Sequence, residues 1–215
     1  MNTKIKTKSY IIALAWPETL CKKAGAWYDG IMQNIGVCKN HYYRVGHAAL
    51  VLVNGENGNC HYFDFGRYHA PHGHGRVRDE ETDHELKIHT KASFSLSGGL
   101  ENFEEILNEL KQNTACHGTG SLYASYGLIN FIKGFKAAKQ LQENSPLPYG
   151  PFLWKGTNCS RFVRTVIISA NPTLEHLAKI SFPWMLTPTP GHNVNALSNK
   201  KIIGESQEVF TLASN

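Results

Sequence analysis

Apolar runs of different length and spacing mark the expected strands of this chain. Residues 10–16 are almost all apolar and are followed by a proline, a pattern typical of a buried strand that ends there. A second apolar run, 42–53, is followed by the turn-forming segment 54–59 and by another strand-like run, 60–65. This order predicts a β-hairpin. Weaker signals predict further strands at 85–97, 201–203 and 209–212.

Apolar residues repeated every three to four positions predict helices between the strands. One such pattern begins after Pro17, a residue favoured in a first helical turn, and extends to Ile35. Another begins after Asn158, which can cap a helix, and it places Phe162 and Val166 on one face. The same spacing predicts helices at 100–112, 121–142 and 174–180.

Two segments are expected to lack regular structure. Residues 66–84 are rich in glycine, histidine and charge, which predicts a long surface loop of the kind that often rims a site. Residues 144–156 hold three prolines and two glycines, so a helix cannot continue through them. The first loop contains an imidazole cluster whose spacing matches no recognised zinc site, so we expect solvent or substrate contacts there rather than a metal. Its members are His69, His72 and His74.

The composition is that of a globular protein with one core. With 215 residues, 11% of them aromatic, the chain can bury enough apolar area to fold as a single domain over 1–215. The net charge of +5 is scattered, so we expect no nucleic-acid partner. No stretch approaches the ~20 apolar residues of a membrane span. The lysines near the N-terminus precede a short apolar run without a convincing cleavage site, which favours a cytoplasmic location without a signal peptide.

The cysteines are odd in number and include no CxxC pair. This pattern argues against a disulfide framework and against a structural zinc site. We therefore expect no metal and no cofactor, and a free thiol becomes the feature to explain. The cysteines are Cys21, Cys38, Cys60, Cys116 and Cys159.

Cys159 has the most favourable position for reactivity. It lies in the first turn of the helix expected after Asn158. Unpaired backbone amides and the helix dipole at such a terminus favour negative charge and lower the pKa of a thiol. Arg161 and Arg164 add positive charge nearby. The other four cysteines lack this setting and are expected to be inert.

His47 lies near the start of the first strand of the expected hairpin, and Gly46 before it would let a neighbouring helix end approach closely. If the turn holds an even number of residues, paired positions sum to an odd number and His47 shares a face with Asp64. Asp64 would then orient the imidazole, as the third member of a thiol and histidine site. A bulge would reverse the parity and bring His61 to that face. The residues favour Asp64 and leave His61 as the alternative.

Two motifs carry a resemblance to a known family. Gly46-His47-Ala48-Ala49-Leu50 lies on a strand, and Asn158-Cys159-Ser160-Arg161-Phe162-Val163 opens a later helix. This order, with the histidine first, resembles the circularly permuted branch of the NlpC/P60 superfamily, which includes relatives of lecithin:retinol acyltransferase. The resemblance covers about residues 42–168, and the His-rich insertion after Asp64 departs from its pattern. It implies a papain-like α+β fold of circularly permuted order, in which the cysteine helix packs on an antiparallel sheet that bears the histidine.

The resemblance also implies a cysteine hydrolase that cleaves an amide bond. Cys159 would attack as a thiolate and form an acyl-enzyme, His47 would act as base and then as acid, and Asp64 would orient His47. The superfamily suggests a peptide or a cell-wall-type muropeptide as the substrate. Two alternatives stay open: a lipid acyltransferase or thioesterase that uses the same three residues, and a non-catalytic ligand-binding module.

Two tryptophans are candidates for the walls of a substrate pocket. Trp16 precedes a proline and Trp154 lies near a glycine, settings in which aromatic side chains can line a cleft. With His61 they complete the expected substrate contacts. The expected partner is accordingly a small-molecule or peptide substrate.

Overall fold

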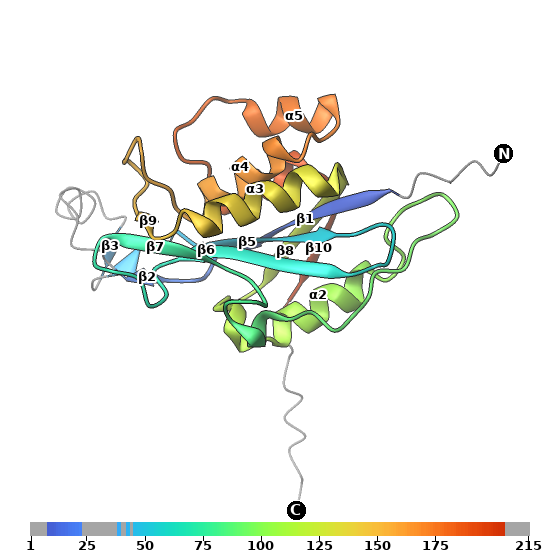
Figure 1. Ribbon diagram of the computed structural model, residues 1–215, viewed down its shortest axis with the longest axis horizontal. Helices are drawn as coiled ribbons and strands as arrows, with labels where there is room; N and C mark the ends of the chain where they lie inside the picture. The colour runs from blue at the N-terminus through green and yellow to red at the C-terminus, as the bar shows by residue number, and fades with distance from the viewer. Residues whose placement is uncertain (1–7, 23–37, 40–41, 44, 205–215) are drawn as a thin grey trace, which may run out of the picture.

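The computed structural model describes residues 8–22, 38–39, 42–43 and 45–204. Its main feature is a seven-stranded sheet in the order β10-β8-β1-β5-β6-β7-β9, in which every neighbouring pair is antiparallel (Figure 1). Together with the helices that cover it, this sheet confirms the expected α+β class. The strands are β1 (Ser9–Trp16), β5 (His47–Val53), β6 (Cys60–Gly66), β7 (His74–Arg78), β8 (Leu122–Ile129), β9 (Leu147–Pro148) and β10 (Ser198–Ile203).

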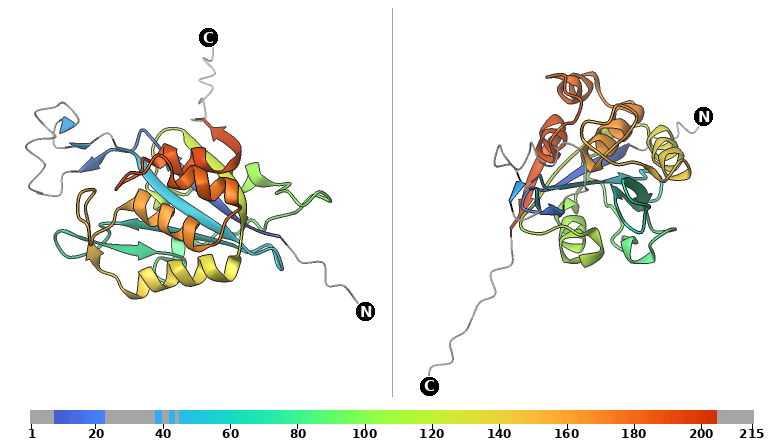
Figure 2. Two further views of the ribbon diagram at one scale, coloured as in Figure 1. Left: turned by 90° about the horizontal axis from the view of Figure 1, so that it is seen from above. Right: turned by 90° about the vertical axis from the view of Figure 1, so that its left-hand side faces the viewer.

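Helices lie on both faces of the sheet. One face is covered by α2, and the other by a layer that contains α3, α4, α5 and α6, as Figures 1 and 2 show from three directions. The helices are α2 (Phe103–Gln112), α3 (Phe131–Glu143), α4 (Cys159–Ser169), α5 (Leu174–Ser181) and α6 (Pro190–Ala196), with the short 3-10 helices η1 (His84–Leu86) and η2 (Thr114–Cys116). A small second sheet has the order β2-β4-β3, with β2 (Cys21–Lys22), β3 (Cys38–Lys39) and β4 (Tyr42–Tyr43).

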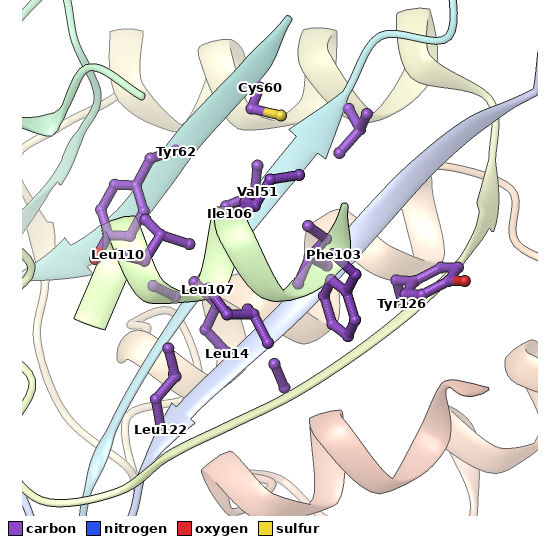
Figure 3. Close-up of a cluster of buried hydrophobic side chains, with 14 of the residues drawn as sticks. Leu14, Val51, Cys60, Tyr62, Phe103, Ile106, Leu107, Leu110, Leu122 and Tyr126 are labelled. Carbon is purple, nitrogen blue, oxygen red and sulfur yellow. The ribbon is translucent and has the colours of Figure 1, made fainter. Parts of the chain in front are cut away.

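Burial on both faces explains why β1 is apolar at nearly every position. Leu14 and the other even-numbered residues of β1 join the core beneath α2, whereas Ala13 and the other odd-numbered apolar residues join the core beneath α4. Figure 3 shows the first of these cores, in which Leu14 and Val51 of the sheet lie against Leu107 of α2. The helix expected at 100–112 is confirmed as α2.

The expected hairpin is confirmed and fixes the register of the two central strands. Val53 of β5 pairs with Cys60 of β6, and the turn between them is closed by a hydrogen bond from the backbone N–H of Asn54 to the carbonyl of Asn59 (2.9 Å). Paired positions therefore sum to an odd number. The run expected at 42–53 is divided, because β4 and β5 belong to different sheets.

The segment 121–142, expected to be one helix, contains strand β8 and most of helix α3, with Asn130 between them. The Asn130 side chain caps α3 by accepting a hydrogen bond from the backbone N–H of Lys133 (3.0 Å). β8 pairs with β1 and with β10, and its residues Leu122, Ala124 and Tyr126 are buried in the core beneath α2. Periodicity alone does not separate a short buried strand from a buried helix, which is the reason for the error.

The loop expected at 66–84 is also wrong in part, since β7 lies inside it and pairs with β6. The reverse error occurs at 85–97, where strands were expected. That segment, described throughout, contains the end of η1 and an isolated bridge from Phe94 to Leu100, but no named strand. β7 brings a second charged side chain, Arg78, beside Asp64 of the hairpin.

The start of the helix expected after Pro17 is wrong, because Cys21–Lys22 forms β2 and pairs with β4. The rest of that expected helix, residues 23–37, and the expected strand at 209–212 lie outside the described residues. The strand at 201–203 is confirmed as part of β10, and the helix at 174–180 as α5. In the part of the chain that is described, no helix combines the length and apolarity that a membrane crossing requires.

Candidate active site

Cys159 is the first residue of α4, and the residue before it sets the helix start. The side-chain oxygen of Asn158 accepts a hydrogen bond from the backbone N–H of Arg161 (2.9 Å), as an N-cap does. α4 then packs on β5 and β6 through apolar residues that include Phe162 and Val163. The helix start is thereby fixed against the sheet, with Cys159 only 8% exposed.

His47 is the first residue of β5 and lies opposite the last residue of β1, Trp16. The imidazole is 6% exposed. Gly46 before it has a φ of +73°, a conformation that favours glycine, and a Cβ there would lie 2.9 Å from the carbonyl oxygen of Trp16. Glycine thus lets the chain enter β5 tight against the end of β1.

Asp64 of β6 approaches the His47 ring from the neighbouring strand. Its Oδ2 atom lies 3.4 Å from His47 Nε2, and the carboxylate is fully buried. The register pairs Asp64 with Ala49, so Asp64 and His47 share a face of the sheet. At 3.4 Å the contact is long for a hydrogen bond, and we describe it as an ion pair. The His47 side chain also forms a hydrogen bond with the Cys159 thiol.

The pKa values of His47 and Cys159 are displaced in opposite directions. Burial would lower the pKa of the His47 imidazole, but Asp64 and Cys159 raise it to about 9. Burial would raise the pKa of the Cys159 thiol, but His47 and the backbone amides of Ala48 and Ser160 lower it below its ordinary value of 9.0. The pair therefore favours a thiolate beside an imidazolium, the form in which a cysteine attacks a carbonyl carbon.

Asp64 is held by more than His47. Arg78 of β7 donates from Nε to Oδ1 (3.0 Å) and from Nη2 to Oδ2 (2.6 Å), and the Tyr62 hydroxyl donates to Oδ2 (3.2 Å). Burial would raise the pKa of the Asp64 carboxyl, but His47 and Arg78 hold it below its ordinary range. Asp64 is therefore an ionised carboxylate at neutral pH.

The other described thiols differ sharply from Cys159. Burial raises the pKa of Cys21 to about 11 and the pKa values of Cys60 and Cys116 to about 12. Among the cysteine side chains that the structure describes, Cys159 is thus the one with a lowered pKa. The side chain of Cys38 lies outside the described residues.

The three expected substrate contacts lie in different surroundings. The Trp16 ring is 1% exposed and stacks on His47, so it supports the site from within. Trp154 is 76% exposed, and its carbonyl oxygen accepts a hydrogen bond from Arg161 of α4 (3.3 Å). His61 pairs with Leu52 on the opposite face of the hairpin from Asp64, and its Nδ1 lies 3.2 Å from Glu80. The structure brings Trp16 to His47 and separates His61 from it.

Sequence reasoning missed three neighbours of this site: Arg78, Tyr68 and His117. The guanidinium carbon of Arg78 lies 3.5 Å from the centre of the Tyr68 ring, and that ring stacks on the His117 imidazole at 5.0 Å between centroids. His117 is exposed and has a φ of 52°, and burial and Arg78 lower its pKa. The alternation of charged and apolar residues at 76–78 is the signal that identifies β7, and with it Arg78.

The His-rich segment does not gather a metal site among the described residues. No group of three or more histidine, cysteine or acidic side chains that could hold a metal ion occurs in that part of the chain. His74 begins β7, and its Nδ1 lies 3.0 Å from the carbonyl oxygen of His72. His69 adopts a φ of 49° in the preceding turn.

Comparisons with known proteins agree on one family. The model of the family described as type VI secretion system effector TseH-like matches residues 11–176. A crystal structure of the type VI secretion system effector TseH is similar, with a TM-score of 0.57 and 18% sequence identity over 88% of this chain and 87% of that chain. At this identity the likeness shows a shared fold. None of the curated protein sequences matches the chain.

Proposed function

We propose a hydrolytic effector function for this chain, which belongs to the family of TseH-like type VI secretion system effectors. The reaction that the site supports best is the cleavage of an amide bond by a thiolate nucleophile. One observation carries this proposal: the pKa values of Cys159 and His47 are displaced in opposite directions within a buried pair at a helix start. Such displacements are typical of sites that perform chemistry.

In the proposed reaction, the Cys159 thiolate attacks the carbonyl carbon of the amide, and the His47 imidazolium gives its proton to the leaving amine. The acyl group is then held as a thioester. Neutral His47 takes a proton from water, the water oxygen attacks the thioester, and the acid leaves with the thiolate and the imidazolium restored. The backbone amide of Cys159, in the first turn of α4, donates to the oxyanion, and Asp64 orients His47.

The proposal includes a papain-like arrangement in circularly permuted order, as in the NlpC/P60 branch named above. Its support is that β5, which bears His47, precedes α4 in the chain, and that α4 packs on the antiparallel sheet with Cys159 at its start. In this arrangement the sheet supplies the base and the carboxylate, and the helix supplies the nucleophile.

A peptide or a cell-wall-type muropeptide is the proposed substrate. An effector of a secretion system meets its target outside the cell that makes it, and peptide cross-links of a cell wall are amides available there. The cytoplasmic location expected from the sequence then describes the place of synthesis.

The test is a product analysis with purified full-length protein, cell-wall material and, in parallel, an acyl thioester. Mass spectrometry should detect newly released amino groups from the wall material with the wild type. Cys159→Ala and His47→Ala should each lower this release by about a thousandfold or more, as removal of a nucleophile or its base does. Turnover of the thioester without amide cleavage would support a thioesterase instead. Absence of both reactions would support a ligand-binding module.

A further inference from the structure

Arg78 donates two hydrogen bonds to the buried carboxylate of Asp64. The Nε–Oδ1 distance is 3.0 Å and the Nη2–Oδ2 distance is 2.6 Å, the forked geometry of a strong arginine–carboxylate pair. The side chains of both residues are almost inaccessible, at 4% and 0% exposure. Oδ2 is the carboxylate oxygen that faces His47, and it accepts one of these two hydrogen bonds.

The guanidinium of Arg78 is itself enclosed. It lies flat enough over the Tyr68 ring to bring its carbon 3.5 Å from the ring centre, and Nη2 also donates to the carbonyl oxygen of Ala115 (3.0 Å). The position of the Arg78 guanidinium is thus fixed by strand β7, by the Tyr68 ring and by the backbone after α2. Because Arg78 is fixed by these contacts, the Asp64 carboxylate that it binds is fixed as well.

The negative charge of Asp64 depends on its ion pair with Arg78. An isolated carboxylate without exposure to water is costly and takes up a proton instead of remaining charged. Removal of one partner from a buried ion pair leaves the other uncompensated. Without Arg78, Asp64 becomes a neutral acid near neutral pH and no longer favours the protonated form of His47.

We propose that Arg78 is a positioning residue of the site, which keeps Asp64 ionised and aimed at His47 without touching the substrate. This inference rests on the proposed function. Its consequence is that Arg78 controls, through Asp64, how much of Cys159 is present as thiolate beside an imidazolium.

Several other titratable groups lie beside Arg78, Asp64, His47 and Cys159 and influence their pKa values. Burial raises the pKa of Cys159 and His47 lowers it, and Cys159 in turn raises the pKa of Cys21. The remaining groups around Asp64 and Arg78 are Tyr62, Tyr68, Asp83, Cys116 and His117. The variants below leave all of them in place.

Arg76 provides a matched control on the same strand. It forms the same forked pair with Asp83, with Nη1–Oδ2 and Nη2–Oδ1 distances of 2.7 and 2.8 Å. That pair makes no contact with His47 in the described residues, so its loss removes a forked but more exposed salt bridge without changing the carboxylate of the site. Arg76→Met therefore separates a general effect of losing an ion pair from the effect specific to Arg78.

The experiment measures the rate of alkylation of Cys159 by iodoacetamide as a function of pH in full-length protein, with site-resolved mass spectrometry. Arg78→Met should move the titration of His47 to lower pH by about one unit, a tenfold loss of its proton affinity, and should lower the alkylation rate at pH 7. Arg78→Lys, which keeps the charge but lacks the fork, should fall between. Arg76→Met should follow the wild type.

A wild-type profile in Arg78→Met would overturn the inference and leave the proposed function standing. Slow alkylation of Cys159 in the wild type, no faster than Cys21, would overturn the proposed function and the inference with it. If Arg78→Met does not fold by circular dichroism, Arg78→Lys decides: an intermediate profile supports the positioning role, and a wild-type profile contradicts it.

Discussion

Trp16 and His47 are strand partners whose rings stack, with centroids 5.8 Å apart and planes inclined by 24°. The indole is 1% exposed, so it forms a rigid support for one side of the imidazole. Asp64 contacts the edge of the His47 imidazole, and the Trp16 ring packs against its face and limits how far the imidazole can tilt. The orientation of the base is therefore determined by two neighbouring strands, β1 and β6, on either side of β5.

Gly118→Ala should disturb this stack. A Cβ at Gly118 would lie 2.2 Å from the Trp16 indole, which cannot move aside in a packed core. We expect a loss of about 1–3 kcal/mol in the free energy of unfolding, as for other overpacked cores, and slower alkylation of Cys159. Urea unfolding and iodoacetamide labelling measure the two effects. Gly191→Ala is the control, because a Cβ at Gly191 meets nothing within 4 Å; equal effects of both variants would refute the explanation.

The described thiols should differ in reactivity. Brief iodoacetamide treatment at pH 7 should label Cys159 first, because its pKa is lowered, whereas burial raises the pKa of Cys21 to about 11 and that of Cys60 to about 12. His47→Ala should slow the labelling of Cys159 and leave Cys21 unchanged. Peptide mapping gives the rate at each site. Uniform labelling would remove the basis for a nucleophile.

Hydrolysis should show an alkaline limit near pH 9. The raised pKa of His47 keeps the imidazolium, which must protonate the leaving amine, up to about pH 9, and the rate falls as pH rises through that value. On the acid side the rate falls only below the lowered pKa of Cys159. The dependence of kcat/KM on pH measures both limits. An alkaline limit near 6.5, the ordinary pKa of histidine, would contradict the proposed environment of His47.

Asp64→Asn should destabilise the protein strongly at neutral pH. It leaves the buried Arg78 without its charge partner, a loss of about 3–5 kcal/mol. Because the pKa of Asp64 is lowered in the folded state, this contribution is present above its ordinary pKa of 3.8 and is lost as pH falls through the folded value. Urea unfolding at neutral and at acidic pH should therefore show a difference that shrinks with acid. Asp83→Asn, in a more exposed pair, should cost about 1 kcal/mol or less.

Leu107→Ala should destabilise the fold without altering the ranking of thiol reactivities. Leu107 is fully buried between α2 and the sheet, and large-to-small changes there cost about 2–5 kcal/mol. α4 and Cys159 belong to the core on the other face. Unfolding curves and labelling patterns test both parts. Leu96→Ala, at a fully exposed position, should change the free energy of unfolding by less than about 0.5 kcal/mol.

The sequence predicts those features that depend on local patterns. The turn formers at 54–59 define the hairpin and its register, and Asn158 marks the start of α4, so the elements bearing His47, Asp64 and Cys159 follow from short-range signals. The partnership of Asp64 with Arg78 depends on the register in which β7 pairs with β6, and the alternation at 76–78 indicates the strand but not this register. The helix predicted over β8 is wrong because the strand packs apolar residues on both of its faces, a pattern that does not show the alternation of a half-exposed strand.

β1 precedes the other described strands in the chain and yet lies inside the main sheet, between β5 and β8. On the ribosome, β1 can pair with β5 early, but β8 and α4 emerge only after more than half of the protein has been made. His47 and Asp64 are then already present in a nascent chain that still lacks Cys159. The proposed nucleophile therefore joins these two strand residues only after translation has passed the start of α4.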